Sequence, residues 1–177
     1  SLEALGDMED ETILENGVRT GEYYLCPRET LKPCVVDPAP YEVGGKTVLL
    51  ASFTVPIVSD GEFMGIAGAD LSMEFLQQML HESNQDLYDG QGEQALVSAS
   101  GRLVAFTGEG AKPGDHASLV LDQMEMDAIA AVGRSNEPLF QIESEGVDHL
   151  QLIMPVTLPG TDVRWSLLIK LPLAVVM

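Results

Sequence analysis

The first half of the chain is dominated by apolar segments that short polar turns interrupt. Residues 40–58 and 63–71 are rich in Val, Leu, Ile and Phe, with a Gly-Gly pair inside the first segment and Ser-Asp-Gly-Glu between the two. Apolar runs bounded by glycine-containing turns are typical of antiparallel strands. We therefore predict consecutive hairpins over residues 40–71, with Gly61 supplying a positive φ angle in the second turn.

The apolar spacing changes to a helical period after these hairpins. Residues 72–81 carry apolar side chains at the separations of one helix face, namely Met73, Phe75, Leu76, Met79 and Leu80. The residues that follow are polar and rich in glycine, which is typical of a linker. We place a boundary inside this polar stretch, which divides the chain into a first module, 1–84, and a second module, 85–177.

The second half repeats the mixture of strands and helix. Residues 94–108 predict a hairpin with a Ser-Gly turn, and residues 112–133 predict a helix that ends at its last glycine. Three more strands are predicted at 139–144, 148–157 and 164–171. Together the two halves predict an α+β fold with antiparallel sheets and flanking helices.

A short internal similarity links the two halves. The segment TVPIVSDG ends at Gly61, and the segment IMPVTLPG ends at Gly160. In each, a strand passes through a proline and reaches a glycine turn, and proline in a strand indicates an edge or a bulge. The similarity favours two copies of one small module.

The composition is that of a folded and strongly acidic protein. Hydrophobic residues make up 45% of the chain, enough for a core. The net charge is −19, which repels phosphate backbones and therefore argues against nucleic-acid binding. The same charge either attracts cationic ligands or keeps the protein soluble.

The two cysteines, Cys26 and Cys34, lie in a segment that also contains Pro27 and Pro33. The prolines predict a turning loop. A disulfide that closes this loop would suit an oxidising compartment. Two free thiols are the alternative, while a zinc site would need further ligands that the neighbouring sequence lacks.

The ends of the chain differ from those of an ordinary complete domain. No apolar run reaches membrane-spanning length. The last residues, WSLLIKLPLAVVM, are nevertheless strongly apolar. We expect the chain to be a piece of a larger protein whose flanking segments reach a membrane.

Sequence motifs of catalysis are missing. No phosphate-binding loop occurs, the serines lack the setting of a hydrolase nucleophile, and the histidines lack metalloprotease spacing. The residues concerned are Ser52, Ser98, Ser100, His81, His116 and His149. We therefore expect no enzyme activity, no cofactor and no metal, although a hydrolase site assembled from scattered residues is an alternative.

Several short motifs occur in an order that carries a family resemblance. They are Tyr23-Tyr24, Pro40-Tyr41, Pro56-Ile57 and the run GIAGADL from Gly65 to Leu71. In this order they resemble the double-Cache periplasmic sensor domains of bacterial methyl-accepting chemotaxis proteins, in particular the amine-sensing members. The second half resembles the membrane-proximal module of that family.

The resemblance implies an architecture and a location. Each module would be a PAS-like antiparallel sheet with flanking helices, with residues 1–84 as the membrane-distal, ligand-binding module and 85–177 as the membrane-proximal one. The family's long N-terminal helix and first distal strands have no counterpart here, so the first module is expected to be incomplete at its N-terminus. The full receptor would be a homodimer in the inner membrane, with this part in the periplasm.

The resemblance also implies a site for a small molecule. Asp70 matches the aspartate that holds a ligand ammonium, and an ionised carboxylate that is buried needs such a partner. Tyr23 and Tyr24 match an aromatic pair of which one lines the pocket, and Tyr41 takes the place of a further tyrosine. Arg28 follows the pair, whereas the family's carboxylate-binding arginine precedes it, which favours an amine or polyamine over an amino acid.

The implied function is a sensor that binds a small cationic ligand (an amine, polyamine or amino acid) and signals across the membrane without catalysis. Two alternatives remain open. The same sensor could serve a histidine kinase or a diguanylate cyclase. The chain could instead be a structural or interaction module without a ligand, in which Asp70 caps the helix after Leu71.

Overall fold

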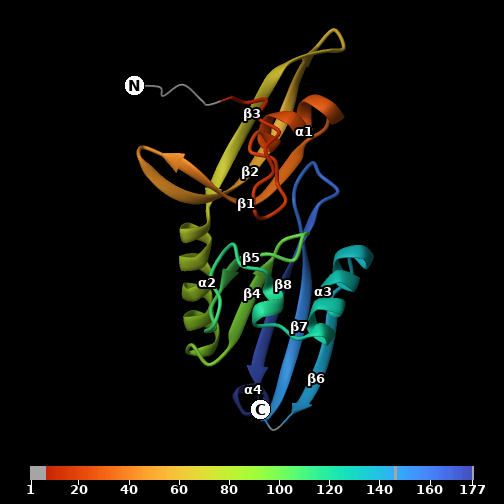
Figure 1. Ribbon diagram of the computed structural model, residues 1–177. Coiled ribbons are helices and arrows are strands. Elements are labelled where there is room, and N and C mark those ends of the chain that lie inside the picture. The colour runs from red at the N-terminus through yellow and green to blue at the C-terminus, as the bar shows by residue number, and fades with distance from the viewer. Residues whose placement is uncertain (1–6, 146, 177) are drawn as a thin grey trace. The chain divides into compact units, whose positions relative to one another are not determined.

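The computed structural model of the 177-residue chain describes residues 7–145 and 147–176. The contacts within the chain divide it into two compact units, Ser1–Leu71 and Ser72–Met177. Each unit contains its own antiparallel sheet (Figure 1). The α+β class with flanking helices is therefore confirmed.

The first unit is a three-stranded sheet with one helix. Strands β1 (Cys34–Val43), β2 (Lys46–Ser59) and β3 (Glu62–Ser72) lie in the order β1-β2-β3. Helix α1 (Glu22–Thr30) packs against β1 and β2 (Figure 1). Gly61 has φ +83°, as the turn between β2 and β3 requires. The predicted consecutive hairpins are confirmed.

Helix α1 corrects one prediction, because its segment was expected to be a loop. Pro27 lies inside the helix, where its fixed φ is helical although its nitrogen cannot donate a hydrogen bond. The helix buries Leu25 and Pro27. A disulfide joins Cys26 on α1 to Cys34, the first residue of β1. Packing and this covalent link outweigh the local tendency of proline to end a helix.

The prolines of the first sheet lie where a neighbouring strand is missing. Pro38 and Pro40 belong to β1, an edge strand whose pairing with β2 is interrupted by a bulge. Pro56 lies beyond Thr54, the last residue of β2 that pairs with β1. Proline has no N–H to donate, so these positions cost the sheet few hydrogen bonds.

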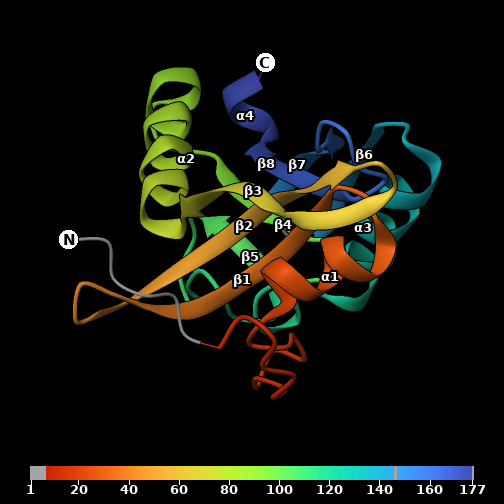
Figure 2. The same ribbon diagram turned by 90° about the horizontal axis from the view of Figure 1, so that it is seen from above.

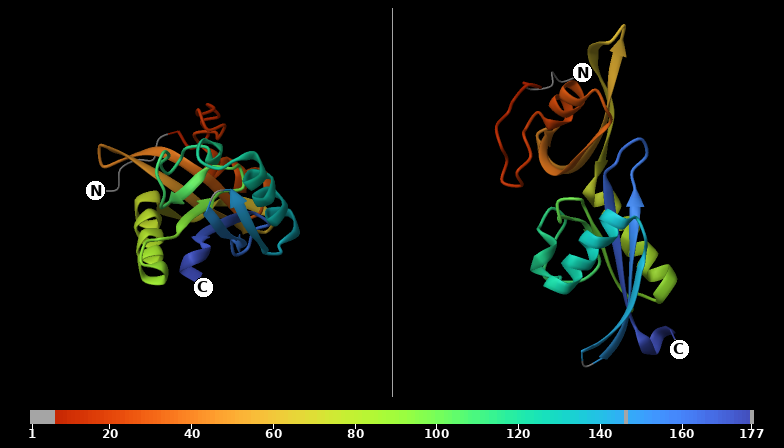
Figure 3. Two further views of the ribbon diagram at one scale, coloured as in Figure 1. Left: turned by 90° about the horizontal axis from the view of Figure 1, so that it is seen from below. Right: turned by 90° about the vertical axis from the view of Figure 1, so that its right-hand side faces the viewer.

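The second unit is a five-stranded sheet in the order β5-β4-β8-β7-β6. Helix α3 lies on one face of this sheet, and helices α2 and α4 lie on the other (Figures 2 and 3). In chain order the elements are α2 (Met73–Tyr88), β4 (Glu93–Val97), β5 (Leu103–Phe106), the 3-10 helix η1 (Ala117–Leu119), α3 (Gln123–Ser135), β6 (Leu139–Glu145), β7 (Val147–Thr157), β8 (Arg164–Pro172) and α4 (Leu173–Val176).

The observed boundary between the units precedes α2, whereas the sequence placed it at residue 84. Helix α2 continues through much of the predicted linker, to Tyr88. Its residues Met73, Leu76 and Leu80 are buried. The amide of Gln77 binds the backbone of Phe106 on β5 through both of its polar atoms. These contacts place α2 in the second unit, and the assignment of distal and proximal modules stays a prediction.

The internal similarity corresponds to one hairpin in each unit, with a longer connection in the second unit. Pro155 lies in β7 beyond Ile153, the last β7 residue that pairs with β6, just as Pro56 lies beyond the pairing of β2 with β1. Gly160 has φ +76°, close to the value at Gly61. In both units, therefore, a proline lies beyond the pairing with the outer strand, and a glycine with positive φ lies in the turn that follows.

Helix α3 closes the main core of the second unit. Asp122 and Glu125 form a reciprocal capping box at its start. Ile129 and Val132 pack against the sheet residues Val97, Ile153 and Leu168. The helix begins at Gln123 rather than at residue 112, passes Gly133 and ends at Ser135, where the cap residue Asn136 has φ +58°, so both predicted bounds are wrong.

A buried ion pair ties α3 to the sheet. Glu125 is only 3% exposed and pairs with Lys170 on β8, whose side chain is 21% exposed. Gln151 also donates to Glu125, over 2.9 Å. A charged carboxylate at such a position depends on its cation and on its hydrogen bonds.

We predict that Lys170→Met destabilises the second unit by about 3 kcal/mol, the low end for breaking a buried pair, because Lys170 retains some solvent contact. Trp165, the only tryptophan, is buried in this unit, so its fluorescence during urea unfolding reports the change. Glu93→Gln removes a more exposed acid 3.8 Å from Lys170 and should cost under about 1 kcal/mol. Equal effects of the two changes would contradict the prediction.

Candidate ligand-binding site

Three of the four predicted ligand-binding residues come together in the first unit. Tyr23 on α1 and Tyr41 on β1 meet edge to face, with 6.4 Å between ring centroids. The charge of Asp70 on β3 acts on both phenols. Ser52 on β2 donates a hydrogen bond of 2.6 Å to Asp70. Each of the four elements of this unit thus supplies one side chain, and we call these four residues the tyrosine–aspartate cluster.

Asp70 belongs to a strand and does not cap a helix. It lies near the end of β3, and the N-cap position of α2 is taken by Ser72. Its side chain is exposed, whereas the predicted ammonium partner was expected because the carboxylate would be buried. Burial therefore does not require a partner for this charge. Among the described residues Asp70 makes no ion pair, and Ser52 orients it. The carboxylate therefore presents an uncompensated negative charge in a defined direction.

The two tyrosines of the cluster are held in their neutral form. Burial raises the pKa of Tyr41, and the Asp70 charge raises it further, while the nearby Ser52 hydroxyl lowers it. Burial also raises the pKa of Tyr23, followed by the charges of Asp70 and Asp7. The Tyr41 hydroxyl oxygen is buried and finds no hydrogen-bond partner of good geometry within the described part of the chain.

Tyr24 faces a different environment from Tyr23. Its ring meets Phe63 edge to face at 5.5 Å, and the guanidinium of Arg28 lies 5.5 Å from the ring centre. Consecutive helix residues point about 100° apart, so only one tyrosine of the pair can face Asp70. The structure brings Tyr23 to the cluster and leaves Tyr24 outside it.

The arginines of the first unit are already engaged by glutamates. Arg28 pairs with Glu9 at 2.6 Å. Arg19 pairs with Glu22 and Glu29, and these two acids, Glu29 first, hold the pKa of Arg19 above its usual range. The cluster therefore has a carboxylate for a ligand cation but no unpaired arginine beside it for a ligand carboxylate.

Ser52 is the member of the tyrosine–aspartate cluster that sequence reasoning missed. It is 3% exposed and lies in the apolar strand segment VLLASFTV together with Thr54, another buried hydroxyl. Two hydroxyl residues on the inner face of an apolar strand were a usable signal, because buried polar groups need partners. What the sequence could not supply was the pairing of β2 with β3 that sets Ser52 beside Asp70.

The described residues contain no group of three or more His, Cys, Asp or Glu side chains that could hold a metal ion. No helix in the same part of the chain is long and apolar enough to cross a membrane. The chemistry that the cluster offers is binding, since a carboxylate and two neutral phenol rings suit an ammonium group through charge and cation–π attraction.

Comparison with known proteins finds similarity to bacterial sensors. No family model matches the chain. It is 27% identical to methyl-accepting chemotaxis protein TlpQ of Pseudomonas aeruginosa, over 94% of this chain and 24% of that protein. The chain thus spans about a quarter of the length of this relative.

Solved structures share the fold. The extracellular domain of the histidine kinase candidate mmHK1S-Z2 superposes with a TM-score of 0.67 at 24% identity, over 88% of this chain and 56% of that one. The ligand-binding domain of the Pseudomonas aeruginosa amino acid chemoreceptor PctC, solved with GABA, gives 0.54 at 21% identity, over 92% and 66%. The chain therefore has the Cache-type, PAS-like fold of such sensor domains.

We predict that Asp70→Asn lowers the pKa of both Tyr23 and Tyr41, because it removes a charge that disfavours their phenolates. NMR titration with 13C-labelled tyrosine measures each phenol. Since the folded pKa values lie above those of the unfolded chain, the stability linked to them is complete below about pH 10 and is lost as the pH rises through the folded pKa values. Asp60→Asn, an equal charge change in the β2–β3 turn, should leave both pKa values in place.

Proposed function

We propose that this chain is part of the extracytoplasmic sensor domain of a chemoreceptor and that the tyrosine–aspartate cluster binds a small cationic ligand. The observation that carries the proposal is the carboxylate of Asp70, which Ser52 orients, two tyrosines flank and no described cation neutralises. An ammonium group supplies the missing charge. The similarity to a chemotaxis protein and to sensor domains supports the biological role.

The charges around the cluster favour an amine or polyamine over an amino acid. An amino acid brings a carboxylate, which needs its own cationic partner. Arg19 and Arg28, the arginines of the first unit, are occupied by glutamates. The negative charges that act on Tyr23 and Tyr41 include those of Asp7 and Glu22 as well as that of Asp70. This surrounding potential attracts cations and repels acids.

The site is connected to the second unit through the chain itself. Asp70 lies in β3, and α2 begins directly after that strand ends at Ser72. A ligand that draws Tyr23 on α1 and Asp70 on β3 together would bias the position in which β3 delivers the chain to α2. The ligand can shift the balance between two such positions only by the difference in its affinity for the two corresponding conformations of the site. The proposal needs no catalytic step.

In the intact receptor this chain would lie in the periplasm, as part of a homodimer anchored in the inner membrane. The Cys26–Cys34 disulfide is consistent with that oxidising compartment. A histidine kinase is the second candidate for the output, because a histidine kinase candidate has an extracellular domain of the same fold.

We predict that putrescine binds the chain and that Asp70→Asn weakens binding by about tenfold or more, since a charge-assisted contact is worth at least about 1.4 kcal/mol. Isothermal titration calorimetry at low salt measures the affinity. Asp60→Asn removes the same charge from the exposed β2–β3 turn, where Asp60 has φ +53°, a conformation that Asn tolerates. It should retain binding within about twofold.

The neighbouring tyrosines provide a second matched pair. Tyr23→Ala should weaken putrescine binding by a factor comparable to that of Asp70→Asn, whereas Tyr24→Ala, outside the cluster, should not. Succinate, a dicarboxylate of similar length, should not bind at this site. Tight binding of succinate, or equal losses for the two tyrosine variants, would refute the proposed site.

A further inference from the structure

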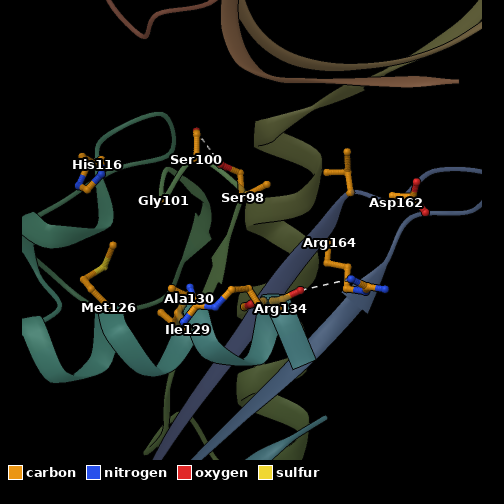
Figure 4. A pocket seen from close by; sticks show the side chains of 14 residues that line it. Ser98, Ser100, Gly101, His116, Met126, Ile129, Ala130, Arg134, Asp162 and Arg164 are labelled. Atoms are coloured by element: carbon orange, nitrogen blue, oxygen red, sulfur yellow. Dashed lines mark hydrogen bonds between the residues drawn. The ribbon is translucent and has the colours of Figure 1, made fainter. Parts of the chain in front are cut away.

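A separate cavity of about 590 Å³ lies entirely within the second unit. It is lined by the turn between β4 and β5, by α3, by His116 before η1, and by the start of β8 with the connection that precedes it (Figure 4). Its volume falls within the range of small-molecule pockets. The polar side chains that line it are Ser98, Ser100, His116, Arg134, Asp162, Arg164 and Ser166.

The cavity gathers positive charge on a very acidic chain. The protein has only nine Lys and Arg residues against 28 acids. Two of the nine, Arg134 and Arg164, line this cavity, together with a single acid, Asp162, which is exposed. Neither arginine forms an ion pair with an acidic side chain in the described ranges, whereas Arg19, Arg28 and Lys170 all do.

The contacts of Arg164 leave part of its guanidinium unused. Its Nη1 donates to the carbonyl of Gly133 over a long 3.4 Å. Its Nε is buried and has no hydrogen-bond partner among the described residues. A buried donor without an acceptor is costly, and a carboxylate is the acceptor that matches the forked geometry of a guanidinium. Arg134, in the last turn of α3, is an exposed second arginine that lines the cavity (Figure 4).

The remaining wall favours a ligand with a short aliphatic body. Met126, Ile129 and Ala130 line the cavity from α3, and Val163 lines it from the strand connection. These side chains offer apolar contact, which an inorganic anion such as phosphate would not use. The wall thus combines guanidinium groups and hydroxyls with an apolar surface.

We propose that this cavity binds a small organic monocarboxylate, with Arg164 and Arg134 holding the carboxylate and the α3 side chains contacting the aliphatic part. This site goes beyond the proposed function, because it lies in the other unit and selects the opposite charge. It makes the chain a receptor with two sites, one for cations and one for organic anions.

The test is calorimetric titration of the whole chain with butyrate, with butyramide as the neutral isostere and inorganic phosphate as the second anion. Butyrate should bind, butyramide should bind at least about tenfold more weakly, and phosphate should not compete. Equal binding of butyrate and butyramide, no binding of butyrate, or stronger binding of phosphate would each overturn the proposal.

Variants locate the binding and separate it from the amine site. Arg164→Gln should weaken butyrate binding by about tenfold, and Arg134→Gln, at an exposed helix end where folding is not at risk, by a smaller but clear factor. Lys112→Gln, an exposed residue of the same unit that does not line the cavity, is the matched control and should bind as the unmodified chain does. Asp70→Asn should also retain butyrate binding, while Arg134→Gln should retain that of putrescine. Full butyrate affinity in both arginine variants would overturn the assignment of the cavity.

Discussion

The hydrogen bond from Ser52 to Asp70 is the contact on which the candidate amine site depends. It joins the central strand of the first sheet to β3 and fixes the direction of an exposed carboxylate. The bond depends on the register of the two strands, because a slip of one strand by one residue would place Ser52 and Asp70 on opposite faces of the sheet. Gly68 allows β3 to lie close to β2 here, since a Cβ at this position would meet the carbonyl oxygen of Phe53 at 2.8 Å. Sheet geometry thus sets the electrostatics of the site.

The surplus of acidic residues gives the two candidate sites contrasting settings. In the first unit, Arg19 and Arg28 are neutralised by glutamates, which leaves Asp70 as the exposed, oriented charge beside two phenols. In the second unit, Arg134 and Arg164 line a cavity, and neither pairs with an acidic side chain of the described residues. Where acids greatly outnumber bases, the placement of a few arginines sets the local charge at each candidate site.

The two units reuse a hairpin but differ in what holds it. In the first, a disulfide links a short helix to the edge strand of a three-stranded sheet. In the second, a five-stranded sheet with helices on both faces has a larger core, and Glu125 is paired inside it with Lys170. The smaller unit can bury less apolar surface, so a covalent link stabilises it where packing alone is limited.

The sequence by itself determined the features that depend on local periodicity. Apolar runs and glycine turns located the strands, and the helical spacing after Ser72 located the start of α2. The position of Asp70 near the end of a strand followed from the same pattern. The tertiary structure alone decided that Pro27 lies in a helix, that α2 packs with the second unit and that Tyr23, not Tyr24, joins Asp70. It also set the contacts of Ser52 and Arg164. Each of these outcomes is set by contacts between residues distant in the chain, and no local pattern of hydrophobicity encodes which distant partner a side chain will meet.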